Sequence, residues 1–422
     1  MRFKKWLMRQ IPPVLQESSF RRYWIGRSLS MVGGQISMLA FPLTAVLVLH
    51  VTPETMGFLT AIGALPSLLL SIQVGAWVDR YGRRRQVMIG SDLGRALLLA
   101  WIPLAVGLHL LNVPLLGGIW LLAGVCSVFF RVASGTLFVA LVPRDQYAEA
   151  NGILQQSQAM AFLVGPAIAG WLIQIFSAPL ALLADALSFL ASAASLARIY
   201  PTEPPVDDVG NHKIGDGMRF IRLSPVLRSM LVSQLVQGLF RAIFMSVYIL
   251  YATRELGVTP AEWGIILGPS SVLALIGSSL AGRITRKMGL GPTLILGTIF
   301  VTIPLLAVPL VEGPHLFVLA VLFVVEGLAG AGSMIRGITT ATVQAVAIPD
   351  SIRARVMAAF SIVGVGTTPV GALLAAILAW RFGVLATLWV ATIGMSVAFV
   401  GLLVPEVFRL RHSEELAVQG TP

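Results

Sequence analysis

A short, strongly basic turn between two uncharged stretches is the feature that most limits what this chain can fold into. The turn reads Gly75-Ala-Trp-Val-Asp79-Arg80-Tyr-Gly82-Arg83-Arg84-Arg85, and residues 55–78 before the Asp and 86–91 after the last Arg carry no charge. Apolar stretches of about 20 residues cross membranes, and Lys and Arg gather in the cytoplasmic loops between them. The turn therefore predicts a cytoplasmic hairpin between two transmembrane helices.

The rest of the chain has the same character. Of 422 residues, 56% are hydrophobic and 12% are charged, and the mean hydropathy is +0.86. A helix needs roughly 20 residues to span about 30 Å of hydrocarbon, so charge-free windows of that length predict an all-α integral membrane protein. Twelve transmembrane helices are expected at about residues 25–50, 56–78, 87–109, 114–141, 148–176, 179–200, 228–252, 261–283, 290–311, 315–342, 353–380 and 383–404.

The basic residues predict the orientation of these helices. Most of the 30 Lys and Arg fall in alternate loops and at the helix ends beside them, on the side that also holds both termini. This bias places both termini in the cytoplasm of a multi-pass protein of the plasma (inner) membrane. The net charge of +11 is spread over many short loops, so we expect anionic membrane lipids rather than nucleic acid as its partner.

The sequence offers no chemistry typical of an enzyme. The single cysteine, Cys126, lies among apolar residues and excludes a disulfide framework, and the five His are scattered. We find no nucleophile with a base, no metal-ligand cluster and no phosphate-binding glycine loop. We therefore expect neither catalytic activity nor a cofactor or metal site.

The two halves of the chain repeat the same landmarks. Gly75 and Gly82 have counterparts in Gly282 and Gly289, an offset of 207 residues, and the Arg131 to Pro143 interval recurs at residues 336–349. This shift predicts two pseudo-symmetric six-helix bundles with a substrate site between them. We expect bundles at 1–200 and 227–405, a cytoplasmic linker at 201–226 and a cytoplasmic tail at 406–422. Residues 218–223 of the linker alternate basic and apolar side chains, which fits a membrane-surface helix or a solvated linker.

Charged residues inside the predicted spans are the first candidates for function. Each costs about 2.5 to 3.5 kcal/mol at the centre of a membrane helix, so few are retained without a role. Asp92 and Arg95 are three residues apart and are expected to form a structural pair within one helix. Glu326 and Arg241 both fall near mid-depth, where a change in access to water can load or release a proton on the Glu. Asp185 is the competing proton carrier and Asp92 is a further candidate, and a static ion pair is the alternative role for Glu326.

Substrate contacts are predicted on two spans. Met31, Gln35 and Met38 share one face of the first span and place an amide between two flexible thioethers, whereas Ser37 is expected to point elsewhere. Gln237 and three aromatic residues follow the seventh span, Phe240, Phe244 and Tyr248. Such an apolar cavity with few polar groups suits amphiphilic organic molecules, and helix packing is the alternative role for each residue.

Three motifs together resemble those of the major facilitator superfamily, over the whole chain. Residues Gly75, Asp79, Arg80, Gly82, Arg83 and Arg84 match the loop motif of that family. Arg131 and Gly135 match its fourth-helix motif, with Ser134 where Gln is usual. Gly165, Pro166 and Gly170 fit the fifth-helix motif of its antiporters. The pattern is most similar to the branch of enterobactin exporters and macrolide efflux proteins.

This resemblance implies the major facilitator fold and transport by alternating access. The expected function is proton-coupled export of drugs or amphiphilic metabolites, siderophore-like or macrolide-like, by a monomer. In this family the loop Asp packs against the eleventh helix, so Asp79 is expected to latch the two halves, unless it only sets topology. The family also places Glu326 and Arg241 beside the central cavity. A lipid or lysolipid flippase, an uncoupled facilitator and a membrane receptor are the alternatives.

Overall fold

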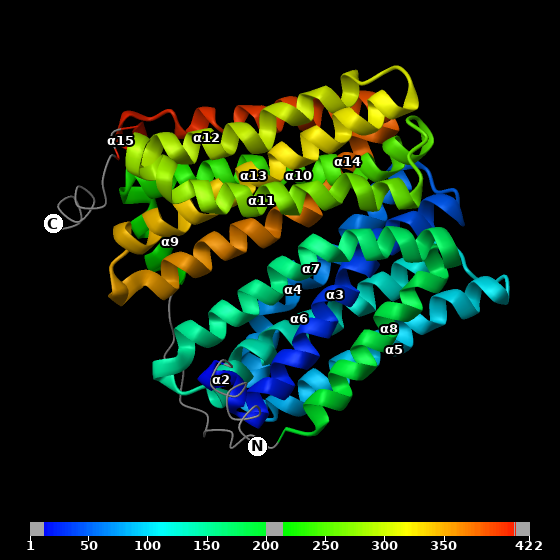
Figure 1. Cartoon of the computed structure of the whole chain (residues 1–422), viewed down its shortest axis with the longest axis horizontal. Helices are drawn as coiled ribbons and strands as arrows, with labels where there is room; N and C mark the ends of the chain where they lie inside the picture. Colours follow the sequence, from blue (N-terminus) through cyan, green and yellow to red (C-terminus); the bar gives the residue numbers. More distant parts are fainter. Residues whose placement is uncertain (1–11, 200–213, 409, 411–422) are drawn as a thin grey trace, which may run out of the picture. The chain divides into compact units, whose positions relative to one another are not determined.

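The first unit of the chain is a bundle of long helices. The computed structural model describes residues 12–199, 214–408 and 410, and within them every regular element is helical. By contacts, residues 12–50 and 62–199 form this unit, and 51–61 group with the second unit. Its helices, drawn from blue to green in Figure 1, are α2 (Pro13–Gln16), α3 (Ser18–Leu47), α4 (Pro53–Tyr81), α5 (Arg84–Gly107), α6 (Val113–Leu141), η1 (Arg144–Gln146), α7 (Tyr147–Phe176) and α8 (Ala178–Ala197).

The second unit repeats this architecture from residue 214 onward. Its long helices cross the unit side by side, with α10 packed on α14 and α13 packed on both α11 and α12. The elements are α9 (Ile214–Leu223), α10 (Pro225–Arg254), α11 (Pro260–Met288), α12 (Leu290–Thr302), η2 (Ile303–Leu310), α13 (His315–Ala347), α14 (Asp350–Val397), η3 (Val400–Leu402) and α15 (Pro405–Phe408).

Two departures from the predicted spans have local causes. Pro304 and Pro309 each remove a backbone donor, and the ninth span finishes as the 3-10 helix η2 rather than as α-helix. In α14, Gly383 adopts φ 82° and ψ 172°, which interrupts the helix between two of the predicted spans. Eleven helices of the described chain are long and apolar enough to cross a membrane, and α14 is long enough for two. The prediction of an all-α membrane fold with twelve spans is confirmed.

Large apolar side chains cover the outside of both units. Leu97, Leu316 and Trp380 are each more than two-thirds exposed in the structure. A soluble protein rarely leaves such long apolar surfaces in water, whereas lipid tails solvate them without cost. The exposed apolar surface is therefore the face that the bilayer covers.

Backbone angles repeat between the two halves at the same interval as the sequence landmarks. Residues with a positive φ angle stand at the ends of helices, where the chain turns sharply. In the described chain they form four pairs, each 204 to 207 residues apart: His50 with Gly257, Gly82 with Gly289, His109 with Gly313, and Ser177 with Gly383. The pairing confirms the predicted duplication, because corresponding turns keep a positive φ angle although three of the four residues in the first half are not glycine.

Ser177→Gly is expected to stabilise the first unit. Ser177 joins α7 to α8 with φ 88° and ψ 159°, a region that costs a side chain about 1 to 3 kcal/mol, and its hydroxyl does not cap α8. The matched change Gly383→Ala, at nearly the same angles, is expected to destabilise by a similar amount. Thermal unfolding of the detergent-purified protein measures both changes, and a lower melting temperature for Ser177→Gly would contradict the strain.

The linker helix α9 packs on the second unit. Ile221 lies in one core with Val226, Val356 and Phe360, and the Asp216 carboxylate accepts a hydrogen bond from the Arg355 guanidinium at 3.2 Å. Part of the apolar face of α9 is therefore covered by protein, whereas Leu223 is 74% exposed. The two predicted roles of residues 218–223, a helix in the membrane surface or a solvated linker, stay predictions. Residues 201–213 of the predicted linker, and 409 and 411–422 of the predicted tail, lie outside the described residues.

Candidate functional site

A cavity of about 400 Å³ lies within the first unit, between helices α3, α4, α5, α6 and α8. Its walls combine charged, hydroxyl and large apolar side chains. They include Ser37, Met38, Phe41, Arg95, Trp120 and Asp185.

Arg95 and Asp92 form a buried ion pair on α5. The Arg95 guanidinium donates a hydrogen bond to Asp92 Oδ1, one helical turn earlier, and Asp92 is fully buried. The guanidinium carbon lies 4.5 Å from the ring centroid of Phe130 and 4.0 Å from that of Phe189. Both distances are within the range of cation–π contacts, which stabilise the largely buried charge. The predicted pair within one helix is confirmed.

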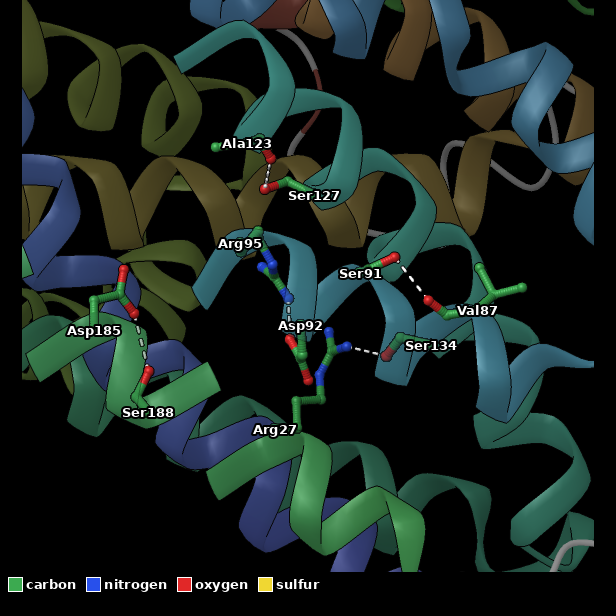
Figure 2. Close-up of polar contacts among 10 residues, drawn as sticks. All are labelled: Arg27, Val87, Ser91, Asp92, Arg95, Ala123, Ser127, Ser134, Asp185 and Ser188. Carbon is green, nitrogen blue, oxygen red and sulfur yellow. Dashed lines mark hydrogen bonds and ion pairs between the residues drawn. The ribbon is translucent and has the colours of Figure 1, made fainter. Parts of the chain in front are cut away.

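Asp185 lies on α8 at the wall of the cavity. Its carboxylate accepts a hydrogen bond of 2.9 Å from the Ser188 hydroxyl, one turn later on the same helix (Figure 2). It accepts another from the Ser37 hydroxyl of α3. Arg95 is near enough to interact electrostatically with it. Ser37 was expected to point away from the substrate face, yet it lines the cavity beside Met38, because the cavity lies against α8 as well as against α6.

The residues predicted to share one face of α3 have different surroundings in the structure. Met38 is 62% exposed and lines the cavity, whereas Gln35 is buried against α7, where a Cβ on Gly165 would approach its side chain to 2.5 Å. Met31 is half-buried. The fifth-helix motif therefore provides close packing, with Pro166 inside α7 and Gly170 buried. Contact of these residues with substrate stays a prediction.

Polar contacts continue along the interior of the first unit beyond Asp92. Arg27 of α3 donates a hydrogen bond to the Ser134 hydroxyl of α6 (Figure 2), and Tyr23 lies 2.8 Å from the same hydroxyl. Ser134 stands where the resembling motif usually has Gln, and it keeps a hydrogen-bonding role. In the same motif, Arg131 is exposed and donates to the Ser67 hydroxyl at 3.3 Å, while a side chain on Gly135 would meet open space.

Gly33→Ala is expected to disrupt the contact between α3 and α8. A Cβ at Gly33 would lie 2.1 Å from Ser188 Oγ and 2.2 Å from Asp185 Oδ1, so it would displace the carboxylate. Gly34→Ala is the matched control, because its Cβ would meet nothing within 4 Å. We expect a loss of about 1 to 3 kcal/mol for Gly33→Ala only. Equal melting temperatures of the two detergent-purified variants would contradict this packing.

Glu326 is the buried acid of the second unit. It lies on α13, 8% exposed, and its Oε1 atom is buried without a hydrogen-bond partner. Tyr248 and Arg241 of α10 interact electrostatically with it, as the sequence predicted for Arg241. Arg241 is exposed, so Glu326 lies near a residue that reaches the surface of the unit.

The other cavity candidates on α10 are packed between helices. Phe244 and Tyr248 are fully buried, with ring centroids 4.5 Å apart, and Trp263 of α11 packs edge-on against Tyr248. Gln237 is buried, and the Phe240 ring lies where a Cβ on Gly394 would stand. In this structure all four contact protein, and their contact with substrate stays a prediction.

The loop motif covers the end of α4, a sharp turn and the start of α5. Helix α4 ends at Tyr81, Gly82 has φ 69°, and α5 begins at Arg84, with the Arg83 guanidinium 5.8 Å from the Tyr81 ring centroid. Gly75 lies inside α4 and Arg80 is exposed. The side chain of Asp79 lies outside the described residues, so the latch stays a prediction.

Comparison with known proteins identifies the family. A sequence model of the Major Facilitator Superfamily matches residues 23–363 and 230–419. The chain belongs to this superfamily. It is thus a multi-pass membrane transporter and not an enzyme, as the sequence predicted.

Relatives within the Major Facilitator Superfamily are efflux proteins. The multidrug efflux pump Tap of Mycolicibacterium fortuitum is 28% identical over 90% of this chain and 93% of its own length. Macrolide efflux protein A of Streptococcus pyogenes is 22% identical over 93% and 96%. Among solved structures, a bacterial homologue of the iron transporter ferroportin in the inward-facing state superposes with a TM-score of 0.75 at 17% identity, covering 92% of this chain and 98% of that one. That likeness supports the fold alone.

Sequence reasoning missed part of the site in this superfamily member. The contact of Ser188 with Asp185 was predictable from the sequence, because Ser188 follows Asp185 by three residues, a spacing that places both on one helical face. The stacked pair of Phe41 and Trp120, with ring centroids 4.8 Å apart, joins α3 to α6 and leaves no comparable pattern in the sequence.

Proposed function

We propose that this transporter exports drugs or other amphiphilic organic molecules from the cytoplasm in exchange for protons. The observation that carries the proposal is a buried carboxylate in each unit, Asp185 at a cavity wall and Glu326 beside Arg241 and Tyr248. Such groups are expensive inside a membrane, and a carboxylate is the side chain that binds and releases a proton most readily when its exposure changes.

The efflux relatives support export as the direction of transport. Both a multidrug pump and a macrolide efflux protein align with nearly the whole chain. We infer that both termini face the cytoplasm, because this orientation leaves most basic loops inside. Alternating access of the two units to opposite sides of the membrane is the proposed mechanism, with the Gly75 to Arg84 motif as its cytoplasmic latch.

Transport into inverted membrane vesicles tests the proposal. Vesicles that contain the full chain are energised with an acidic interior, and uptake of ethidium and of a macrolide is followed with and without the pH gradient. We expect gradient-dependent uptake that a protonophore abolishes. Equal uptake with and without the pH gradient would indicate a facilitator. Movement of labelled lysolipid, without uptake of either drug, would indicate a flippase.

A further inference from the structure

We propose that a small cavity in the second unit binds one chloride ion, with Arg336 as its counter-charge. The cavity lies between α10, α12, α13 and α14, which Figure 1 labels, and has a volume of about 10 Å³. Its polar wall residues are Ser233, Gln234, Arg336 and Thr340. A resident ion at this place is independent of the substrate and of the direction of transport.

Arg336 has no counter-charge among the side chains that the structure describes. Of the described residues that line the cavity, it alone is charged. Its electrostatic neighbour is Arg241 of α10, which has the same sign, whereas the buried acid Glu326 interacts with Arg241 instead. A guanidinium inside a membrane span is costly unless an opposite charge accompanies it. An anion at the cavity would supply that charge.

Ser233 is the second group at this cavity that needs a partner. It is 2% exposed, and its Oγ atom is buried without a hydrogen-bond partner in the described chain. Gln234, the next residue on α10, already donates a hydrogen bond of 3.1 Å to the Phe360 carbonyl. A hydroxyl and a guanidinium both donate hydrogen bonds, so the ligand that fits them is an acceptor. The charge of Arg336 favours an anion over a water molecule, because charge-assisted hydrogen bonds are stronger than neutral ones.

The size of the cavity restricts the ligand to a monatomic ion. A volume of about 10 Å³ is roughly that needed for one atom of the size of a water molecule. Phosphate, sulfate and an organic carboxylate are all too large for it. Chloride is slightly larger than water, and Met230 in the wall has a flexible side chain that can adjust to it.

Close helix packing keeps the cavity small. A Cβ at Gly297 of α12 would lie 2.7 Å from the Arg336 backbone nitrogen, and one at Gly364 of α14 would lie 2.8 Å from Gln234 Nε2. Helices α12 and α14 therefore approach the polar wall residues closely from two sides. Apolar side chains, among them Leu294, complete the wall and offer no charge to Arg336.

Thermal unfolding in two sodium salts tests for the ion. The detergent-purified full chain is heated in sodium chloride and in sodium gluconate at equal ionic strength, because gluconate carries the same charge but is too large for the cavity. We expect the melting temperature to rise with chloride concentration until the site is saturated and to stay constant in gluconate. Transport is not measured, so the result is independent of the proposed export.

Arg336→Gln should abolish the rise that chloride causes. In gluconate this variant should be at least as stable as the unchanged protein, because it removes a charge that has no partner. Arg228→Gln is the matched control, since Arg228 is an exposed residue of α10 in the same unit, and it should keep the full rise.

Ser233→Ala tests the site without changing its charge, so it decides the matter even where Arg336→Gln does not fold. We expect it to weaken the apparent affinity for chloride at least fivefold. Ser246→Ala should leave that affinity within twofold, because Ser246 is also buried on α10 but its hydroxyl donates to the Ala242 carbonyl at 2.7 Å. Equal melting temperatures of the unchanged protein in the two salts, as a water molecule in the cavity would give, would overturn the inference. So would a full chloride effect in Arg336→Gln, its loss in Arg228→Gln, or an unchanged affinity in Ser233→Ala.

Discussion

Glu326→Gln is expected to abolish pH-gradient-driven export while ligand binding without a gradient stays within about twofold. Gln keeps the size of the side chain and its capacity to interact with Tyr248 but cannot exchange a proton. Glu326 is buried, and a neutral amide costs less to bury than a carboxylate, so we expect the protein to fold with Gln at this position. The measurement is substrate uptake by inverted vesicles with and without an imposed gradient, normalised to protein level.

Glu255→Gln is the matched control for this change. Glu255 follows the last turn of α10 and is exposed, so its neutralisation removes the same charge from the second unit without touching the buried acid. A Glu326→Gln protein that remains fully coupled would eliminate Glu326 as the proton carrier. Asp185 would then be the remaining candidate in our proposal.

Arg95→Gln is expected to cause the largest loss of stability in the first unit, about 3 to 5 kcal/mol. Removing one partner of a buried ion pair leaves the other charge without compensation. Arg95→Gln leaves both Asp92 and Asp185 unneutralised, whereas Asp92→Asn leaves an Arg that still interacts with Asp185. We therefore expect Arg95→Gln to be the more harmful of the two single changes.

The double variant Asp92→Asn with Arg95→Gln separates pairing from general damage. It removes both charges together, so we expect it to be more stable than Arg95→Gln alone. Thermal unfolding of the four detergent-purified proteins completes the double-mutant cycle. Strictly additive losses would show that the two charges do not stabilise one another.

Contacts within one helix were predictable, whereas most contacts between helices were not. The three-residue spacing of Asp92 and Arg95 placed them on one face of α5, because helical geometry follows from local sequence. Nothing in the sequence linked Ser37 to Asp185, which are 148 residues apart, or Arg95 to the ring of Phe189. These contacts depend on how each helix is rotated about its axis against its neighbours.

In a membrane protein, the hydropathy of a span does not show how its helix is rotated about its axis. Spans such as α6 are apolar over most of their surface, since one face meets lipid and the other meets protein, so no continuous polar face marks the outside. The sequence predictions for α3 and α10 selected faces by spacing alone. In the structure Met38 reaches a cavity, whereas Gln35, Phe244 and Tyr248 are packed between helices.

The sequence by itself determined the membrane spans, the duplication and the turns, because apolar length and backbone preference are local properties. Gly82 and Gly289 mark corresponding turns in both the sequence and the backbone angles. Only the tertiary structure decided which side chains surround the cavity and that Arg95, paired with Asp92, also interacts with Asp185 of another helix. Those outcomes depend on helix packing, which brings residues from distant spans within reach of a single charge.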